Sequence, residues 1–361
     1  MFLNQVGSHF KEKTYLGRIN KQTTQKQPYK VDASPNDFIE IPFYSSLKHF
    51  ISSNIKNVFQ LVKTINRAIK KSDILWLAWP HPISLLIILL QIGKGKKVIL
   101  NVRCDLAKLV SIRYSGVSRF LGLGFISFSN QLLKWFFKDV QVLVTGSELK
   151  AMYSEFLPNT HAIKNTIISR DDCFLPEREL SGSVHLLSVG RLEPEKGIEY
   201  LLKAIPLIKK KYPLKLSIVG NGQNEAKLKS LSKDLGITDS VSFHGYVPFG
   251  EDLFRHYVYS DILVLPSLSE GLPRVVNEVR GFGLPIVSTH VGGLKTELQD
   301  QQNCLKVEVQ SPEDISKKVI ALIEHENLYE RISANLYGES LTNTIEYQSA
   351  NVISKIISRY D

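Results

Sequence analysis

Apolar positions in the second half of the chain follow two periods in turn. Short, mostly apolar runs, such as 184–190 and 214–220, predict buried β-strands. The longer run 197–213 repeats its apolar residues every three or four positions, which predicts an amphipathic helix. Its apolar face consists of Ile198, Leu201, Leu202, Ile205 and Ile208. Buried strands that alternate with such helices predict an α/β fold whose parallel sheet is covered on both faces.

The same two patterns recur along the rest of the chain. Further strands are predicted at 36–44, 72–80, 96–102, 140–147, 241–245, 261–267, 285–290 and 303–309. Further helices are predicted at 50–70, 127–138, 224–236, 251–260 and 274–283. A polar, turn-rich stretch at 170–183 fits a linker, so the sequence predicts two α/β domains. Residues 1–35 show no clear period.

Length and composition agree with this organisation. The 361 residues exceed the usual size of one core, and 43% hydrophobic with 22% charged residues excludes a disordered or collagen-like chain. The most apolar run, 83–92, is shorter than the roughly 18 residues of a membrane span and predicts a buried helix or strand. The three cysteines, Cys104, Cys173 and Cys304, lie far apart, which argues against a disulfide framework or zinc cluster and indicates a reducing cytoplasm.

Charge is divided unevenly between the two halves. Residues 1–150 carry 22 Lys and Arg and 8 Asp and Glu, a balance of +14, whereas residues 151–361 carry 23 and 27, a balance of −4. The basic half suggests an anionic partner: nucleic acid, an anionic membrane surface or a phosphorylated substrate. The alternative is that surface lysines only keep the chain soluble.

Two loops that follow predicted strands carry charges suited to an anionic ligand, and ligands of parallel sheets bind beyond the carboxyl ends of the strands. The segment VGRLEPEKG, 189–197, places Arg191 and Lys196 before a helix start, where free N–H groups and two cations suit a diphosphate. The segment SEGLPRVVNE carries Glu270 and Glu278, which are too far apart along a helix to share one proton but can hold two parts of one extended ligand. Solvated charges at ordinary turns are the structural alternative for both segments.

Two further loops are less specific. The segment VGNGQ, 219–223, has only a G-x-G spacing, which predicts a tight turn open to a ligand and is a weak dinucleotide fingerprint. The segment FHGYVP, 243–248, places His244 at a strand end, where a histidine is either a general base or a structural residue. The order and spacing of all four loops in one sheet carry more information than any loop alone.

Together these loops resemble the donor-binding domain of retaining glycosyltransferases of family 4. The pattern GRL…KG…VGNG…FHGYVP…PSLSEGLPRVVNE…GLPIVSTHVGG carries the resemblance, which extends over 184–310 and more loosely over 72–170. The resemblance implies the GT-B fold, with two facing Rossmann-like domains, parallel sheets and helices on both faces. It implies an acceptor-side domain at 1–172, a nucleotide-sugar-binding domain at 183–340 and a C-terminal helix at 341–361 that packs back on the N-terminal domain.

The resemblance also implies a role for each matching residue. Arg191 and Lys196 would hold the donor diphosphate, and Glu270 would contact the sugar hydroxyls; these three would be the catalytic groups. Glu278 would bind the ribose hydroxyls. The remaining donor contacts would come from Gly190, Gly220, Tyr246, Val247, Gly271 and Leu272. Of these, Tyr246 and Val247 would lie near the base, and the backbone amides of Gly271 and Leu272 would touch sugar or phosphate.

The implied chemistry agrees with elementary electrostatics. Fixed cations in a cleft stabilise the charge that develops on a departing nucleoside diphosphate more in the transition state than in the ground state. The chain has no Asp-x-Asp motif to hold a metal. The resemblance therefore implies a UDP-, GDP- or ADP-sugar donor with no metal and no cofactor required, and transfer on one face of the sugar with a donor phosphate oxygen taking the proton of the acceptor.

The acceptor side departs from the family pattern. Residues 1–35 lack the glycine-rich loop of many relatives, and the chain has VILNVRCDL where many relatives carry a histidine after a central strand. In that segment, Arg103 could bind a phosphate of the acceptor or donor and Asp105 could orient it. Equally, the two residues could form a structural ion pair.

The leading interpretation is a retaining hexosyltransferase that moves a sugar to a glycan or lipid-linked acceptor in cell-surface polysaccharide or glycolipid synthesis. A phosphorylated acceptor, or an anionic membrane surface contacted by Lys94, Lys96, Lys97 and the lysines of 48–71, would explain the basic half. The protein would then be cytoplasmic and peripheral at the inner face of the membrane. Alternatives are a nucleotide-sugar epimerase on the same fold and a non-catalytic homologue that binds the donor. A nucleic-acid partner is not expected, because no aromatic–basic motif of a known module is present.

Overall fold

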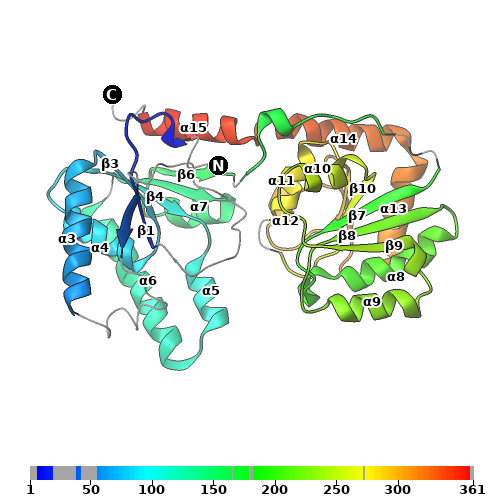
Figure 1. The fold of residues 1–361 in the computed structure, drawn as a ribbon, viewed down its shortest axis with the longest axis horizontal. Coiled ribbons are helices and arrows are strands. Elements are labelled where there is room, and N and C mark those ends of the chain that lie inside the picture. Colours follow the sequence, from blue (N-terminus) through cyan, green and yellow to red (C-terminus); the bar gives the residue numbers. More distant parts are fainter. Residues whose placement is uncertain are drawn as a thin grey trace. The chain divides into compact units, whose positions relative to one another are not determined.

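A computed structural model of the chain divides into two compact units (Figure 1). Unit 1 comprises residues 3–165 and 351–361, and unit 2 comprises residues 166–350. The structure describes residues 6–18, 38–41, 55–137, 139–164, 166–178, 180, 182–270 and 273–357.

Unit 1 is built around a parallel sheet of four strands in the order β3-β4-β5-β6. Its strands are β3 (Ile74–Ala78), β4 (Lys97–Val102), β5 (Gln141–Thr145) and β6 (Thr160–Ile163). Its helices are α3 (Ile55–Lys71), α4 (Pro82–Gln91), α5 (Leu106–Arg113), α6 (Gly116–Phe136) and α7 (Ser147–Ser154). Three of the predicted strands form the main part of this sheet, and β6 is an addition that its short, half-polar sequence did not predict.

The strand predicted at 36–44 lies elsewhere in unit 1. Within the described residues, β2 (Phe38–Ile41) pairs in parallel with β1 (Tyr15–Arg18) and forms a separate two-stranded sheet. A local apolar pattern predicts that a segment is a strand, but it does not say which strand is its neighbour.

Unit 2 contains a parallel sheet of six strands in the order β12-β11-β10-β7-β8-β9. The strands are β7 (Val184–Val189), β8 (Leu214–Val219), β9 (Val241–Gly245), β10 (Ile262–Leu265), β11 (Ile286–Thr289) and β12 (Leu305–Val307). The helices are α8 (Ile198–Lys209), α9 (Glu225–Asp234), α10 (Glu251–Val258), α11 (Arg274–Arg280), α12 (Leu294–Glu297), α13 (Pro312–Glu324) and α14 (Glu326–Ser340), with short 3₁₀ turns η2 (Arg170–Asp172), η3 (Pro194–Lys196) and η4 (Thr238–Ser240). A last helix, α15 (Ile345–Ile357), begins in unit 2 and ends in unit 1. The strand order reverses at β7, which lies between β8 and β10, and a crevice for ligands opens at such a reversal.

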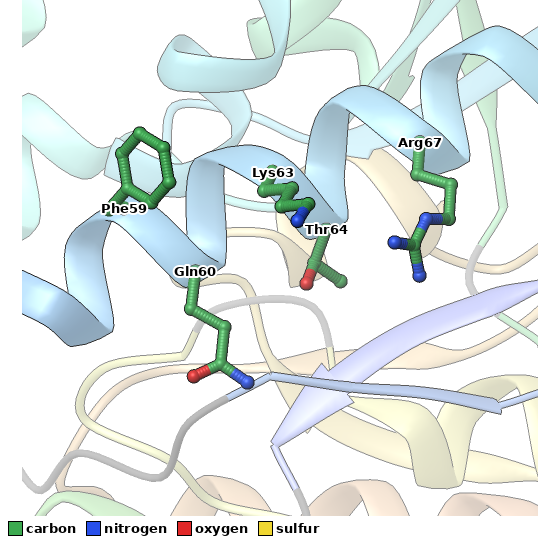
Figure 2. A pocket seen from close by; sticks show the side chains of 5 residues that line it. All are labelled: Phe59, Gln60, Lys63, Thr64 and Arg67. Carbon is green, nitrogen blue, oxygen red and sulfur yellow. The ribbon is translucent and has the colours of Figure 1, made fainter.

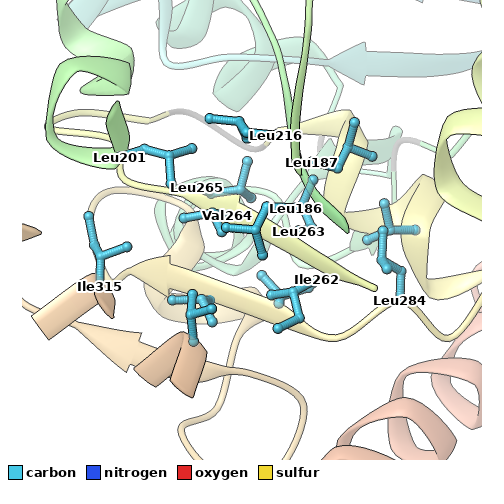
Figure 3. Packing of buried hydrophobic residues seen from close by; sticks show 14 of the residues in the cluster. Leu186, Leu187, Leu201, Leu216, Ile262, Leu263, Val264, Leu265, Leu284 and Ile315 are labelled. Carbon is cyan, nitrogen blue, oxygen red and sulfur yellow. The ribbon is translucent and has the colours of Figure 1, made fainter. Parts of the chain in front are cut away.

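The core of unit 2 lies on both faces of this sheet. All four residues of β10 are buried, and Figure 3 shows them packed among leucines and isoleucines from neighbouring elements. The five apolar residues predicted for one face of α8 are all buried. In Figure 1, α8 and α9 cover one face of the sheet, and α10, α11 and α14 cover the other. The predicted α/β fold with parallel sheets is confirmed.

The segment that the sequence marks as a linker packs against unit 2. Ile168 belongs to the core of this unit, and the guanidinium of Arg178 donates hydrogen bonds to the carbonyls of Tyr257 (3.0 Å), Ser260 (3.0 Å) and Phe282 (2.9 Å). Burial lowers the pKa of Arg178. The predicted stretch at 170–183 is thus grouped with unit 2, and the two units divide at 165–166.

The helix α15 runs from residues grouped with unit 2 into residues grouped with unit 1, and the change lies at 350–351. Its packing on the N-terminal domain stays a prediction.

The apolar run at 83–92 is largely the helix α4. No described helix is long and apolar enough to cross a bilayer. All three cysteines are unpaired.

Candidate functional site

The loops at the carboxyl ends of the unit 2 strands are tied together by backbone hydrogen bonds. Leu192, after β7, donates to the carbonyl of Asn221, after β8, at 2.9 Å. Leu268, after β10, donates to the carbonyl of Glu195, in the loop after β7, at 2.8 Å. The loops that flank the reversal of strand order are therefore held as one assembly.

Two glycines permit the closest approaches in this assembly. A Cβ on Gly220, which has φ +135°, would lie 1.8 Å from the carbonyl oxygen of Gly190. A Cβ on Gly292, which has φ +51°, would lie 1.8 Å from the carbonyl oxygen of Glu270. No side chain fits at these distances, so both positions need glycine. Gly292 thereby allows the loop after β11 to lie directly against the backbone of Glu270.

The predicted cation and the first predicted carboxylate meet in this assembly. The ammonium of Lys196, in the 3₁₀ turn η3, forms an ion pair with Oε1 of Glu270, and the hydroxyl of Ser267 donates to the same oxygen at 3.3 Å. Both charged side chains are largely buried, with exposed fractions of 18% for Lys196 and 8% for Glu270. Thr289 donates to the carbonyl of Ser267 at 2.6 Å and so braces the loop that presents the carboxylate.

Arg191, the other predicted cation, is exposed and paired within its own loop. Its side chain is 71% exposed, and its guanidinium forms an ion pair with Glu195, four residues along the same loop, at 3.4 Å. The structure therefore brings Lys196 and Glu270 together and leaves Arg191 paired at the surface. An exposed pair of this kind adds little to stability and leaves the guanidinium free to exchange its partner for an anionic ligand.

Glu278, the second predicted carboxylate, lies on α11 and is almost completely buried. The hydroxyl of Tyr257, on α10, donates a hydrogen bond to its Oε2. Burial raises the pKa of Glu278, and the bond from Tyr257 and the charge of Arg274 oppose that shift. Sequence reasoning missed Tyr257; the signal that could have found it is its place four residues after Leu253, on the apolar face of α10.

Replacing Glu278 by glutamine is expected to stabilise the fold at neutral pH. The folded-state pKa of the carboxyl lies above its ordinary value of 4.5, so the folded protein holds this proton longer than the unfolded chain does. The free energy of unfolding of the wild type should therefore fall as the pH rises from 4.5 through the raised pKa of Glu278. The variant has no carboxyl group at this position, so its free energy of unfolding should lack this decrease. Urea unfolding over this pH range measures the difference, which should grow with pH and then level off.

The matched control for this prediction is Glu326→Gln, which changes an exposed glutamate at the start of α14. This variant should show no such pH-dependent difference from the wild type. A difference for Glu278→Gln that grows as the pH falls would contradict the raised pKa.

The other predicted donor contacts are placed as follows. Tyr246 is exposed and Val247 half-buried, directly after β9, where the amide of Gly220 donates to the carbonyl of Gly245 at 2.7 Å. Gly271 and Leu272 lie outside the described residues. His244 is within 3.2 Å of the hydroxyl of Ser217, which gives it a local structural partner.

The acceptor-side candidates lie in unit 1, after β4. Oδ1 of Asp105 accepts a hydrogen bond from the amide of Lys108 at 3.0 Å and caps the start of α5. Arg103 is exposed two residues earlier, and the described residues give no ion pair between the two. The ion-pair alternative is therefore replaced by a helix cap, a use of aspartate that competes with pairing.

A separate hollow of about 370 Å³ lies along α3 in unit 1. Figure 2 shows the five side chains that line it: Phe59, Gln60, Lys63, Thr64 and Arg67. None of the predicted donor residues belongs to it. Within the described ranges, no group of three or more His, Cys, Asp or Glu side chains is arranged to hold a metal ion.

The sequence of unit 2 matches a known protein family. Residues 176–338 match the family described as glycosyl transferases group 1. An uncharacterized glycosyltransferase of Haemophilus influenzae is 37% identical over 199 residues, which are 54% of this chain and 54% of that protein. The chain thus spans about half the length of the curated relatives that it matches.

Solved structures extend the likeness to both units. Anabaena HepE in complex with UDP has a TM-score of 0.65 at 15% identity and covers 84% of this chain, which covers 82% of it. Sucrose-phosphate synthase from Thermosynechococcus elongatus has a TM-score of 0.67 at 16% identity, with coverage of 99% of this chain and 92% of that one. At these identities the likeness shows the fold, which is that of the GT-B glycosyltransferases.

Proposed function

From the match of residues 176–338 to the glycosyl transferases group 1, we propose that the whole chain transfers a sugar from a nucleoside diphosphate sugar to an acceptor. The observation that carries the proposal is the Lys196–Glu270 pair at the carboxyl ends of β7 and β10. A buried ammonium beside a buried carboxylate offers one group for a phosphate and another for sugar hydroxyls. A complex of Anabaena HepE with UDP supports the same class of donor.

Each side chain has a proposed task in the transfer. Lys196 stabilises the charge that develops on the departing diphosphate, and Arg191 exchanges Glu195 for the same phosphates when the donor binds. Glu270 accepts hydrogen bonds from the hydroxyls of the donor sugar, and Glu278 accepts them from the ribose. Tyr246 and Val247 lie against the base. The positive charge is supplied by the chain itself. The bond from the anomeric carbon to the diphosphate breaks, and the acceptor hydroxyl forms its bond on the same face of the sugar while a donor phosphate oxygen takes the hydroxyl proton. Attack on that face gives a product with retained anomeric configuration, and the nucleoside diphosphate leaves with the proton.

The acceptor is proposed to be a glycan or a lipid-linked, phosphorylated molecule at an anionic membrane surface. The basic balance of residues 1–150 supports an anionic acceptor, and Arg103 is exposed at the carboxyl end of β4, where a phosphate can reach it. The similarity in fold to a sucrose-phosphate synthase is consistent with phosphorylated sugars in this class of enzyme. The proposed activity is that of a hexosyltransferase in cell-surface polysaccharide or glycolipid synthesis.

Thermal unfolding in the presence of UDP-, GDP- and ADP-sugars tests the donor. A ligand that binds only the folded state at about 100 times its Kd stabilises that state by about 2.7 kcal/mol, so one of the three should raise the Tm clearly. The matching nucleoside without phosphates is the control and should have little effect. An unchanged Tm with all three donors would overturn the proposal.

Incubation of the protein with the recognised donor alone then separates the alternatives. Slow hydrolysis that yields the free sugar with the original anomeric configuration supports a retaining transferase. An epimerised nucleotide sugar would identify an epimerase, and binding with no turnover, even with acceptors, would identify a non-catalytic homologue.

A further inference from the structure

The helix α6 in unit 1 exposes an apolar face along its whole length. Of the nineteen large apolar residues that are exposed in the described part of the chain, eight lie within 109–136. Five of these form one line along α6, with exposed fractions between 55% and 76%: Val117, Phe120, Leu121, Phe128 and Trp135. We call this line the α6 stripe.

The spacing explains why these side chains lie on one face. Steps of three, four and seven residues return to the same side of an α-helix, and 21 residues make the helix about 30 Å long. The side of α6 that faces away from the stripe buries Ile126, Ser129 and Leu133, and Leu132 is buried beside them. Leu132 and Leu133 belong to the core of unit 1. The helix is therefore apolar on two sides, and only one side is covered in this structure.

The segment that carries the stripe has charge of one sign in its sequence. Residues 106–137 contain four Lys and Arg (Lys108, Arg113, Arg119 and Lys134) and no Asp or Glu, and Asp139 follows the segment. Asp105 precedes the segment and is engaged as the cap of α5. A second copy of this chain on the stripe would bring two such cationic segments together, whereas an anionic lipid surface would complement both the charge and the apolar side chains.

The composition of the stripe also suits a bilayer surface. Phenylalanine, leucine and tryptophan are the residues that an amphipathic helix buries at the boundary between head groups and acyl chains. Two more exposed apolar residues adjoin the stripe: Tyr114, in the turn before α6, and Leu109, on α5. Lys94, one of the lysines considered from the sequence, instead donates to Oδ1 of Asn66 at 2.5 Å.

We infer that the α6 stripe is a membrane-docking surface that lies in the plane of an anionic leaflet, with Phe120, Leu121 and Trp135 inserted and the neighbouring cations at the head groups. This inference deepens the proposed function, because a lipid-linked acceptor is reached at such a surface. Docking itself needs neither donor nor turnover, so it can be tested independently.

Flotation of the full chain with vesicles tests the inference. Vesicles of equal parts phosphatidylcholine and phosphatidylglycerol should carry the wild-type protein upward at low salt, and vesicles of phosphatidylcholine alone should carry much less. The double variant Phe120→Ser/Leu121→Ser should lose binding by about tenfold or more, because two large apolar side chains no longer enter the leaflet. The control Tyr259→Ser changes an equally exposed aromatic residue in unit 2 and should bind as the wild type does.

Three further measurements make the outcome decisive: the Tm of the double variant, its Tm increase with the nucleotide sugar, and the sedimentation of both proteins. The double variant must keep the wild-type Tm, which is expected because both side chains are exposed. It must also keep the Tm increase with the nucleotide sugar, so failure of docking and failure of donor binding are seen separately. Absence of wild-type binding, or equal binding by the double variant, would overturn the inference. So would a wild-type dimer in sedimentation that the double variant converts to a monomer, since the stripe would then be a contact between copies.

Discussion

Replacing Lys196 by methionine is expected to lower kcat/KM for the nucleotide sugar by about 10²- to 10³-fold, the effect of removing one preorganised group that stabilises developing negative charge. The ammonium is fixed by Glu270 in a largely buried position, so little reorganisation is needed when the diphosphate departs. The loss should appear chiefly in kcat, because the negative charge grows as the bond to the sugar breaks. Steady-state transfer or donor hydrolysis measures it.

The matched control is Lys203→Met, which changes an exposed lysine on α8 in the same unit. This variant should turn over as the wild type does. Arg191→Ala is expected to cost less than the change at Lys196, because the guanidinium is exposed and must be recruited from Glu195. Near wild-type turnover after the change at Lys196 would contradict its proposed role.

A double-mutant cycle separates chemistry from simple structural pairing. Lys196→Met alone leaves the carboxylate of Glu270 largely buried without its cation, and Glu270→Gln alone leaves the ammonium without its anion. If the pair were only structural, the double variant Lys196→Met/Glu270→Gln would recover stability and turnover together. The proposed function predicts recovery of stability only, with turnover at least as low as in either single variant.

Replacing Arg280 by alanine is expected to reduce the free energy of unfolding by about 3–5 kcal/mol, the usual result of removing one partner from a buried ionic network. The guanidinium is 1% exposed. It donates to carboxylates of Glu297 and Glu339, each at 2.9 Å, and to Oδ1 of Asn277 at 2.6 Å. These bonds join α11 to α12 and α14, so the loss falls on the helix that also carries Glu278.

Urea unfolding measures this loss, and Arg331→Ala, an exposed arginine on α14, is the matched control with an expected change near zero. Arg280→Lys should recover little of the stability, because an ammonium cannot reproduce the planar set of hydrogen bonds that the guanidinium donates to four acceptor atoms. A loss below about 1 kcal/mol for Arg280→Ala would mean that the network contributes no more than a surface pair.

The architecture of unit 2 was predictable because each element repeats a simple period. The strand predicted at 184–190 is observed at Val184–Val189, and the helix predicted at 251–260 is observed at Glu251–Val258. Apolar strands and a clean helical face report directly on burial, which is a local consequence of composition. The loops after the strands follow from the parallel topology, so Lys196 and Glu270 could be named from sequence as residues at one edge.

The partners of these side chains could not be read from the sequence in the same way. Arg280 binds Glu339, 59 residues away, and only the packing of α14 on α11 brings them together. Arg191 carries the same charge as Lys196 in the same loop, yet Arg191 is exposed and paired with Glu195, whereas Lys196, in η3, is largely buried against Glu270. A glycine such as Gly292 is visible in the sequence, but the carbonyl that approaches it is not.

The central claim is that the loops around Lys196 and Glu270 receive the diphosphate and the sugar of the donor. A crystal structure of the full chain with the nucleotide sugar that most raises its Tm tests this claim most directly. The account predicts a phosphate oxygen within hydrogen-bond distance of the Lys196 ammonium, sugar hydroxyls at the Glu270 carboxylate and the ribose at Glu278. A nucleotide bound elsewhere, for example in the hollow along α3, with the Lys196–Glu270 pair undisturbed and no ligand beside it, would contradict the account.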